Sequence, residues 1–190
     1  MTFQGFLIAG LGNPGPEYAR TRHNLGARAL FLCAQKWCAP SFRKRFEGEY
    51  VQTVVDGCDV ALLFPHTYMN ISGRSIAAAM RHLGIDRDRL IVLHDDVDLA
   101  FGRLRVKLGG GNGGHNGLKS ISGMVGGPEY TRVRLGVGRP PGDMVEYVLS
   151  AFTADERPSI PDMLENCVNI VETILKKDVT YAMNAFNGQS

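Results

Sequence analysis

Long apolar runs, a secretion signal and paired metal-binding cysteines are all missing from this sequence of 190 residues. No apolar run approaches the roughly 20 residues that cross a bilayer, and no basic residue precedes Arg20, so we expect neither membrane insertion nor secretion. The G-x-x-x-x-G-K-[ST] pattern of NTPase phosphate loops is also absent. The four cysteines contain no C-x-x-C pair and no histidine at zinc-finger spacing. We therefore expect buried, reduced thiols of a cytoplasmic protein at Cys33, Cys38, Cys58 and Cys167.

Acidic residues are missing from residues 18–46, which hold seven Lys or Arg side chains. Residues 99–142 hold seven more basic side chains against Glu129 alone, whereas residues 143–190 carry eight acids against three bases. The net charge is only +2, so the charges are separated along the chain. If the two basic stretches meet on one face, that face would attract a polyanion such as a nucleic acid. A solvated basic surface without a partner is the alternative.

Strand and helix patterns alternate along the chain. Asp56-Gly57 lies between two β-rich segments and favours a tight hairpin. Ser72 has the character of a helix N-cap. Strands are predicted at 6–12, 50–55, 60–64, 90–93, 103–108 and 132–135, and helices at 24–37, 72–83, 118–124 and after Pro158 and Pro161. In the strands at 103–108 and 132–135, basic and apolar residues alternate, which predicts a cationic face. The order predicts one α/β domain over residues 1–190, with a mixed β-sheet flanked by helices.

A dinucleotide fingerprint, G-x-G-x-x-G at residues 10–15, follows the first predicted strand. That fingerprint requires an acid about 20 residues later to bind a ribose hydroxyl, and residues 18–46 contain none. Pro14 also removes a backbone N–H from the loop. A second match at 109–114 lies in a run so rich in glycine that the match is not specific. We therefore expect no nucleotide cofactor.

Polar residues follow most of the predicted strands. Ligand sites in α/β sheets lie outside the carboxyl ends of the strands, so these residues are the first candidates for a site. Histidine, aspartate and several asparagines occur there without a nucleophilic serine motif or a reactive cysteine. This set favours general-base activation of water, with amides that bind the substrate and its oxyanion. The candidates are Asn13, His23-Asn24, His66 to Asn70, Asp95-Asp96, Asn112, His115 and Asn116.

Metal ligation is the main alternative for some of these groups. His94, Asp95, Asp96 and Asp98 are all possible ligands. Adjacent residues of a strand point to opposite faces, so His94, Asp96 and Asp98 would share one face only if the extended conformation continued.

Four ordered motifs resemble those of the bacterial peptidyl-tRNA hydrolases. They are Gly12-Asn13-Pro14-Gly15 continuing to Thr21-Arg22-His23-Asn24, Thr67-Tyr68-Met69-Asn70-x-Ser72-Gly73, His94-Asp95-Asp96-x-Asp98, and Gly113-Gly114-His115-Asn116-Gly117-Leu118-Lys119. The resemblance implies a single α/β domain that acts in the cytoplasm as a monomer, without metal or cofactor. It also implies hydrolysis of the ester that joins a peptide to the 3′ ribose of tRNA.

The resemblance also implies roles for individual residues. His23 corresponds to the catalytic base, Asp95 to the carboxylate that supports it, and Asn13 to the position that distinguishes blocked from free aminoacyl-tRNA. The implied substrate contacts are Tyr18, Tyr68, Asn70, Asn116 and the loop histidine His115, and the implied tRNA-backbone contacts are Arg105, Lys107 and Arg134. One departure is Asn112, which stands where related loops often have a histidine.

Two other functions remain open from the sequence. A non-catalytic RNA-binding relative is favoured by the basic strands and disfavoured by the complete set of His23, Asp95, Asn13 and Asn70. A metal-dependent hydrolase of another substrate would lose its activity in a chelator.

Overall fold

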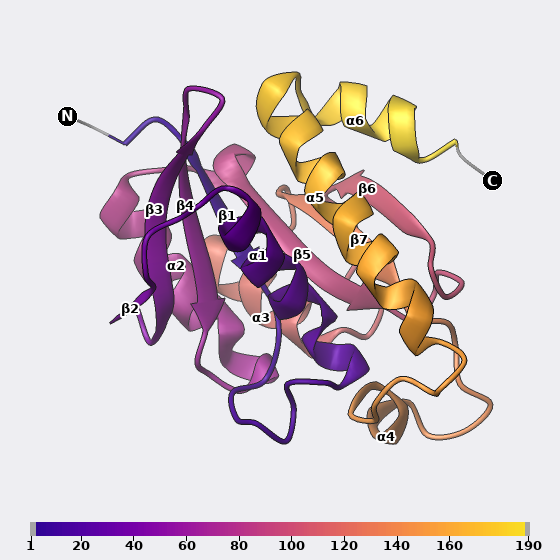
Figure 1. Ribbon diagram of the computed structural model, residues 1–190. Coiled ribbons are helices and arrows are strands. Elements are labelled where there is room, and N and C mark those ends of the chain that lie inside the picture. Colours follow the sequence, from indigo (N-terminus) through magenta and orange to yellow (C-terminus); the bar gives the residue numbers. More distant parts are fainter. Residues whose placement is uncertain (1–2, 189–190) are drawn as a thin grey trace.

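Seven strands form one mixed sheet in the order β2-β3-β4-β1-β5-β7-β6 (Figure 1). The computed structural model describes residues 3–188. Strands β1, β4, β5 and β7 are parallel, whereas β3 runs antiparallel to β4 and β6 antiparallel to β7. The strands are β1 (Phe6–Gly10), β2 (Arg43–Arg45), β3 (Gly48–Val55), β4 (Cys58–Pro65), β5 (Leu90–Asp96), β6 (Leu104–Leu108) and β7 (Thr131–Gly136). The predicted mixed α/β sheet is confirmed.

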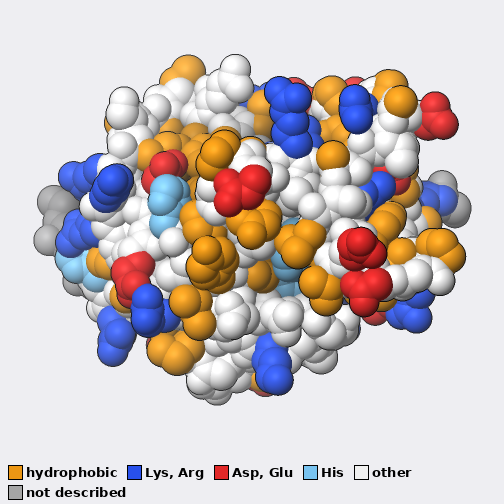
Figure 2. Space-filling model, turned by 90° about the horizontal axis from the view of Figure 1, so that it is seen from below, with side chains coloured by type: hydrophobic (Ala, Val, Ile, Leu, Met, Phe, Trp, Pro, Cys, Tyr) orange, Lys and Arg blue, Asp and Glu red, His pale blue; other side chains and the backbone are white. Residues whose placement is uncertain are grey.

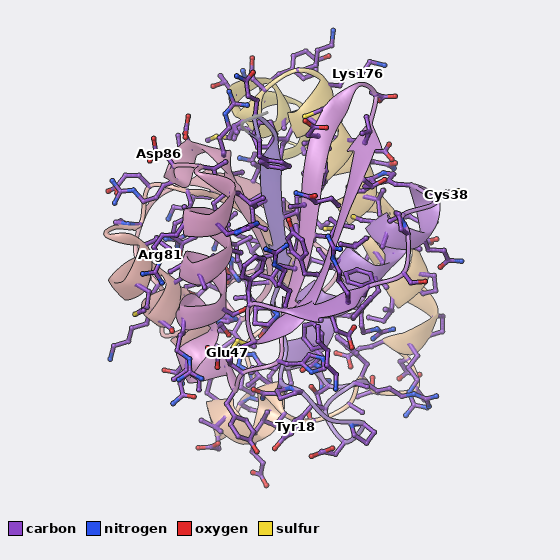
Figure 3. The ribbon with its side chains drawn as sticks, turned by 90° about the vertical axis from the view of Figure 1, so that its left-hand side faces the viewer. Tyr18, Cys38, Glu47, Arg81, Asp86 and Lys176 are labelled. Carbon is purple, nitrogen blue, oxygen red and sulfur yellow. The ribbon has the colours of Figure 1, made fainter. Side chains whose placement is uncertain are left out.

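Helices cover both faces of the sheet, and this explains why its central strands are apolar on both sides. Helices α1 (Leu25–Lys36) and α5 (Ile160–Lys176) pack on one face, and α2 (Ser72–Leu83) and α3 (Asn116–Val125) on the other (Figures 1 and 3). Along β5, Ile91 and Leu93 belong to the first core cluster and Leu90 and Val92 to the second. The sheet is thus fixed from both sides, and the carboxyl ends of its parallel strands form a rigid edge.

The remaining helices are short or lie near the ends of the chain. They are α4 (Met144–Val148) and α6 (Val179–Phe186), with single 3-10 turns η1 (Arg22–Asn24), η2 (Met69–Ile71), η3 (Arg87–Arg89) and η4 (Arg157–Ser159). The Asp56-Gly57 hairpin is confirmed, since both residues have the positive φ angles, 48° and 81°, that a tight two-residue turn requires. No helix within residues 3–188 combines the length and the apolar character needed to cross a membrane.

Ser72 does not cap a helix, contrary to the prediction. It is the first residue of α2, and its hydroxyl donates to the carbonyl of Met69 in the preceding turn. The prediction failed because η2 runs directly into α2, so the chain is already helical when it reaches Ser72. Gly84 ends α2 at φ 67°, as the sequence predicted.

The predicted cationic strand face is only partly correct. Arg132 is 2% exposed and donates to the carbonyls of Gly110 and Gly111, and Arg134 is ion-paired with Asp96. Leu108, predicted to be on the apolar face, is exposed. β2, which carries Arg43, Lys44 and Arg45, and β6, which carries Arg105 and Lys107, lie at opposite edges of the sheet.

The prediction of four buried thiols is also wrong for two of the four cysteines. Cys33 and Cys167 are buried, and burial raises the pKa of the Cys167 thiol to about 12. Cys38 is exposed just beyond α1 (Figure 3). Cys58 is half-buried.

Candidate active site

A cavity of about 500 Å³ lies at the carboxyl ends of β1, β4 and β5. Figure 2 shows the face of the molecule on which α4 lies. Near its centre this surface is hydrophobic, with histidine visible between the apolar side chains, and Lys and Arg lie toward the margins. The cavity is lined by Asn13, His23, Tyr68, Met69, Asn70, Asp95, Asp96, Val97, Asn112 to Asn116, Arg139, the α4 residues Met144, Val145 and Val148, and Leu149, which follows α4. The structure thus brings together candidates that are as far apart in sequence as Asn13 and Asn116.

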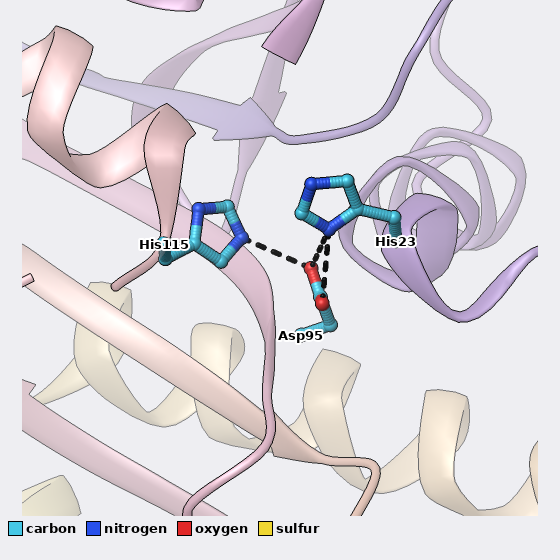
Figure 4. A group of neighbouring side chains, drawn as sticks. All are labelled: His23, Asp95 and His115. Atoms are coloured by element: carbon cyan, nitrogen blue, oxygen red, sulfur yellow. Dashed lines mark hydrogen bonds and ion pairs between the residues drawn. The ribbon is translucent and has the colours of Figure 1, made fainter. Parts of the chain in front are cut away.

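Three of these side chains form a compact polar group (Figure 4). Nδ1 of His23 lies 3.0 Å from both carboxylate oxygens of Asp95. Nε2 of His115 lies 3.0 Å from Oδ1 of the same carboxylate. Asp95 is 2% exposed, so the two imidazoles replace the water that would otherwise solvate its charge.

The hydrogen bonds around His115 determine its protonation. Its Nδ1 accepts from the backbone N–H groups of Gly117 and Leu118, at the start of α3. Nδ1 therefore carries no proton, and Nε2–H donates to Asp95. His23 donates its Nδ1–H to the same carboxylate, so in the neutral imidazole it is Nε2 that is able to accept a proton.

Asp95 stays ionised in this arrangement. Burial alone would raise the pKa of Asp95, but the charges and hydrogen bonds of His23 and His115 hold it well below its usual value. His94 is the opposite case, since burial and the neighbouring His115 lower the pKa of His94 to about 3. A fixed carboxylate thus lies between two imidazoles, beside a third that is neutral at physiological pH.

Each member of the group is delivered by a different element. Asp95 lies within β5, which continues beyond the predicted end at residue 93, whereas His23 lies in η1, directly before α1. His115 is the N-cap residue of α3. His115 does not reach the site as a residue directly after a parallel strand, contrary to the prediction, because β6 runs antiparallel to β7 and ends beside Thr131, at the far end of the strands. Residues 109–115 lead the chain back along the sheet to the site.

The path of the loop at residues 109–115 requires glycine at several positions. Gly109, Gly110, Gly113 and Gly114 all have positive φ values, between 57° and 94°, where other residues are strained. The buried Arg132 holds this loop by donating to two of its carbonyls. The glycines therefore allow the backbone conformation by which this loop returns to the site.

Asparagine side chains surround the histidines. Oδ1 of Asn13 accepts from the backbone N–H of Met69, 2.8 Å away, and Asn13 is nearly buried. Because a backbone N–H can only donate, the group that Asn13 can offer to the cavity is its Nδ2. Asn70 and Asn116 are exposed and line the same cavity.

The other predicted contacts lie at different depths. Tyr68 is exposed and lines the cavity, whereas Tyr18 is half-buried in the loop after Asn13 and is not among the lining residues. Tyr18 is at the same end of the molecule as Glu47 (Figure 3). Its role stays a prediction.

The three predicted tRNA-backbone residues lie together on neighbouring strands. Arg105 is paired in register with Arg134, and Lys107 with Arg132. Lys107 and Arg134 line a cavity of about 210 Å³ that shares Asp96, Asn112 and Gly113 with the larger one. The ion pair between Arg134 Nε and Asp96 Oδ2, 2.7 Å long, partly neutralises one of the three cations.

Sequence reasoning missed the apolar wall that α4 contributes. Met144, Val145 and Leu149 are all at least partly exposed where they line the cavity, and Val148 lies beneath them. These four apolar residues are spaced along 144–149 as on one face of a helix, and this pattern could have been recognised in the sequence. Arg139, also missed, lines the cavity and is ion-paired with Asp98.

Within residues 3–188, His23, Asp95 and His115 are the group close enough to hold a metal ion, with ligand atoms within 4.8 Å of one another. The ring nitrogens that face Asp95 carry its hydrogen bonds, so a metal would have to displace both protons. In the alternative set, Asp96 is paired with Arg134, Asp98 with Arg139, and His94 with the backbone carbonyl of Asp95.

Comparison with known proteins covers nearly the whole chain. A family model described as peptidyl-tRNA hydrolase matches residues 7–190. A peptidyl-tRNA hydrolase of Syntrophotalea carbinolica is 45% identical over 185 residues, which cover 96% of this chain and 97% of that one. One of Sorangium cellulosum is 47% identical over 185 residues, or 95% of this chain and 83% of that one. The crystal structure of peptidyl-tRNA hydrolase from Acinetobacter baumannii matches with a TM-score of 0.92 and 34% identity, covering 100% of this chain and 98% of that one.

Proposed function

The chain belongs to the peptidyl-tRNA hydrolase family and hydrolyses peptidyl-tRNA, and we propose that it does so by general-base attack of water on the ester bond. That ester joins the peptide to the 3′ ribose, so its cleavage frees the tRNA for reuse. The observation that carries the mechanism is the His23–Asp95 pair, in which Nδ1 of His23 is held and the opposite nitrogen is left for water.

The reaction needs one proton carrier. Nε2 of His23 takes a proton from water as its oxygen attacks the ester carbonyl, and Asp95 stabilises the imidazolium that results. When the tetrahedral intermediate collapses, the C–O bond to the ribose breaks and His23 returns the proton to the departing 3′ oxygen. A positioned base typically contributes about 10²- to 10⁴-fold to the rate. His115, as a fixed donor to Asp95, keeps the carboxylate oriented toward His23.

The amides bind the acyl part of the substrate. Nδ2 of Asn13 donates to the carbonyl oxygen that becomes the oxyanion, an interaction typically worth about 10²- to 10³-fold. Asn70 and Asn116 bind the peptide backbone through groups that both donate and accept, and Tyr68 packs beside them. The α4 wall at Met144, Val145 and Leu149 contacts peptide side chains without selecting a sequence. Tyr18 contacts the substrate outside the cavity.

Arg105, Lys107 and Arg134 bind the phosphate backbone of the tRNA. They lie on β6 and β7, next to the smaller cavity that adjoins the catalytic one. Their position suits a polyanion that extends away from a 3′ end bound at His23. We further propose that the enzyme acts as a monomer in the cytoplasm, without a metal or other cofactor.

The decisive test is cleavage of N-acetyl-aminoacyl-tRNA by the purified protein, followed by release of the N-acetyl amino acid. The proposal predicts that cleavage is unchanged after the protein is treated with EDTA and Mg²⁺ is then added back only because the tRNA needs it. Loss of activity that only a transition metal restores would favour metal-dependent hydrolysis at His23, Asp95 and His115. Binding of tRNA without cleavage would indicate an RNA-binding relative.

A further inference from the structure

Asn24 lies directly beside the proposed base but does not line the catalytic cavity. It is 4% exposed and occupies the N-cap position of α1, where an asparagine side chain would ordinarily accept from the first turn of the helix. Here the side chain makes no capping hydrogen bond. The amide group of Asn24 is therefore free to bind another part of the backbone.

Both amide atoms of Asn24 bind the backbone of Asn13. Oδ1 accepts from the N–H of Asn13 at 2.9 Å, and Nδ2 donates to the C=O of Asn13, also at 2.9 Å. Asn24 therefore bonds to the backbone of Asn13 as a neighbouring strand would, and it fixes both the N–H and the C=O of Asn13. The side chain of Asn13 is fixed independently through Oδ1, which accepts from Met69.

The surroundings leave this arrangement little freedom. A Cβ on Gly12 would lie 2.8 Å from Cγ of Asn24, so the asparagine side chain fills the space against the loop. A Cβ on Gly26 would lie 2.1 Å from the carbonyl oxygen of Leu93, so the start of α1 packs directly on β5. The position of Asn13 relative to Asp95 thus depends on contacts made at the N-terminal end of α1.

We infer that Asn24 is a positioning residue, which holds Asn13 so that its Nδ2 faces the ester carbonyl while His23, the next residue to Asn24, faces the water. This inference rests on the proposed function. It assigns Asn24 no contact with substrate. Because one helix start carries both the base and the residue that orients the oxyanion donor, the two catalytic groups are placed by the same element.

The test is a double-mutant cycle with Asn13→Ala and Asn24→Asp, assayed on N-acetyl-aminoacyl-tRNA. Aspartate keeps the acceptor for the N–H of Asn13 but places an oxygen against its carbonyl. We expect Asn24→Asp to lower kcat about 10- to 100-fold, part of the effect of removing an oxyanion donor, with a much smaller change in KM. In the Asn13→Ala background the same substitution should cause no further loss of kcat, because the donor that Asn24 orients is gone. Asn24→Ala removes the same bonds without adding a charge beside His23, so in that variant the acid limb of the pH profile should not move.

Asn187 provides a matched control. Its side chain makes the same two bonds to the backbone of Val106 on the edge strand β6, each 2.8 Å long, and it does not line the catalytic cavity. Asn187→Asp should lower the midpoint of thermal unfolding and leave kcat unchanged. If Asn24→Asp does not fold, Asn24→Ala removes both bonds without adding a charge and should give the same pattern in the cycle.

Three results would overturn the inference: an unchanged kcat in Asn24→Asp, equal losses in the two backgrounds, or a displaced acid limb in Asn24→Ala. Failure of the wild-type protein to cleave its substrate would instead contradict the proposed function. The two failures are therefore distinguishable.

Discussion

His115 donates a hydrogen bond to Asp95 through Nε2, and its Nδ1 accepts from the backbone at the start of α3. His115 therefore cannot compete with His23 for the proton of the attacking water. The two imidazoles that contact Asp95 are therefore not equivalent. The ring of His23 has a nitrogen free for chemistry, whereas both nitrogens of His115 are engaged.

Removing the His115 donor should weaken the support that Asp95 gives to His23. His115→Leu is expected to lower kcat about 10- to 150-fold, the effect of losing one hydrogen bond to a charged group, worth about 1.5–3 kcal/mol. His115→Gln keeps an N–H donor on a side chain of similar reach and should recover part of the rate. Steady-state kinetics of the two variants decide the point, and equal activity in both would show that the donor does not matter.

Asp95→Asn keeps the shape of the side chain and removes its charge. The acid limb of the kcat/KM profile should then move to lower pH, because the imidazolium of His23 loses the carboxylate that stabilises it. The plateau should also fall, since the amide leaves a weaker base and permits the wrong tautomer. The measurement is kcat/KM from pH 5 to 9. An acid limb that stays in place with an intact plateau would separate Asp95 from the mechanism.

His94 makes the stability of the fold depend on pH. Its pKa is about 3 in the folded protein and about 6.5 when unfolded, so between these values the unfolded state binds more protons and stability falls as the pH is lowered. From pH 7 to pH 5 the loss should be about 2 kcal/mol. Asp95 does not contribute in this range, because its pKa lies below the usual value and it is ionised in both states. Urea titrations of wild type and His94→Asn test this, and identical slopes against pH would contradict it.

The basic residues of β6 and β7 should not contribute equally to tRNA binding. Neutralising Arg105 and Lys107 is expected to reduce the slope of log Kd against log salt by roughly 0.7 to 0.9 for each lost phosphate contact. Arg134→Gln should have a smaller effect, because Asp96 already neutralises part of its charge. Filter binding of tRNA across a salt series measures these slopes. An unchanged slope in the triple variant would place the tRNA elsewhere.

The sequence was sufficient for the parts of the fold and site that depend on local pattern. The Asp56-Gly57 hairpin, the buried β5 and the helix ending at Gly84 follow from local residue types. His23, Asp95 and Asn13 were found because ordered motifs carry them, and they line one cavity in the structure.

Features that depend on packing could not be predicted. Arg132 is polar and falls in an alternating strand, yet the carbonyls of a returning loop satisfy it and allow its burial. Ser72 has the composition of an N-cap, but the preceding turn is already helical. The direction of β6 and the protonation of His115 depend on contacts with distant residues, and no local pattern encodes them.

His23→Ala, assayed in parallel for cleavage and for tRNA binding, tests whether His23 is the base. The account predicts that kcat for N-acetyl-aminoacyl-tRNA falls by about 10²- to 10⁴-fold, whereas the affinity for tRNA stays close to that of wild type, because the imidazole transfers a proton and contacts no phosphate. Cleavage within a few-fold of the wild-type rate would contradict the account.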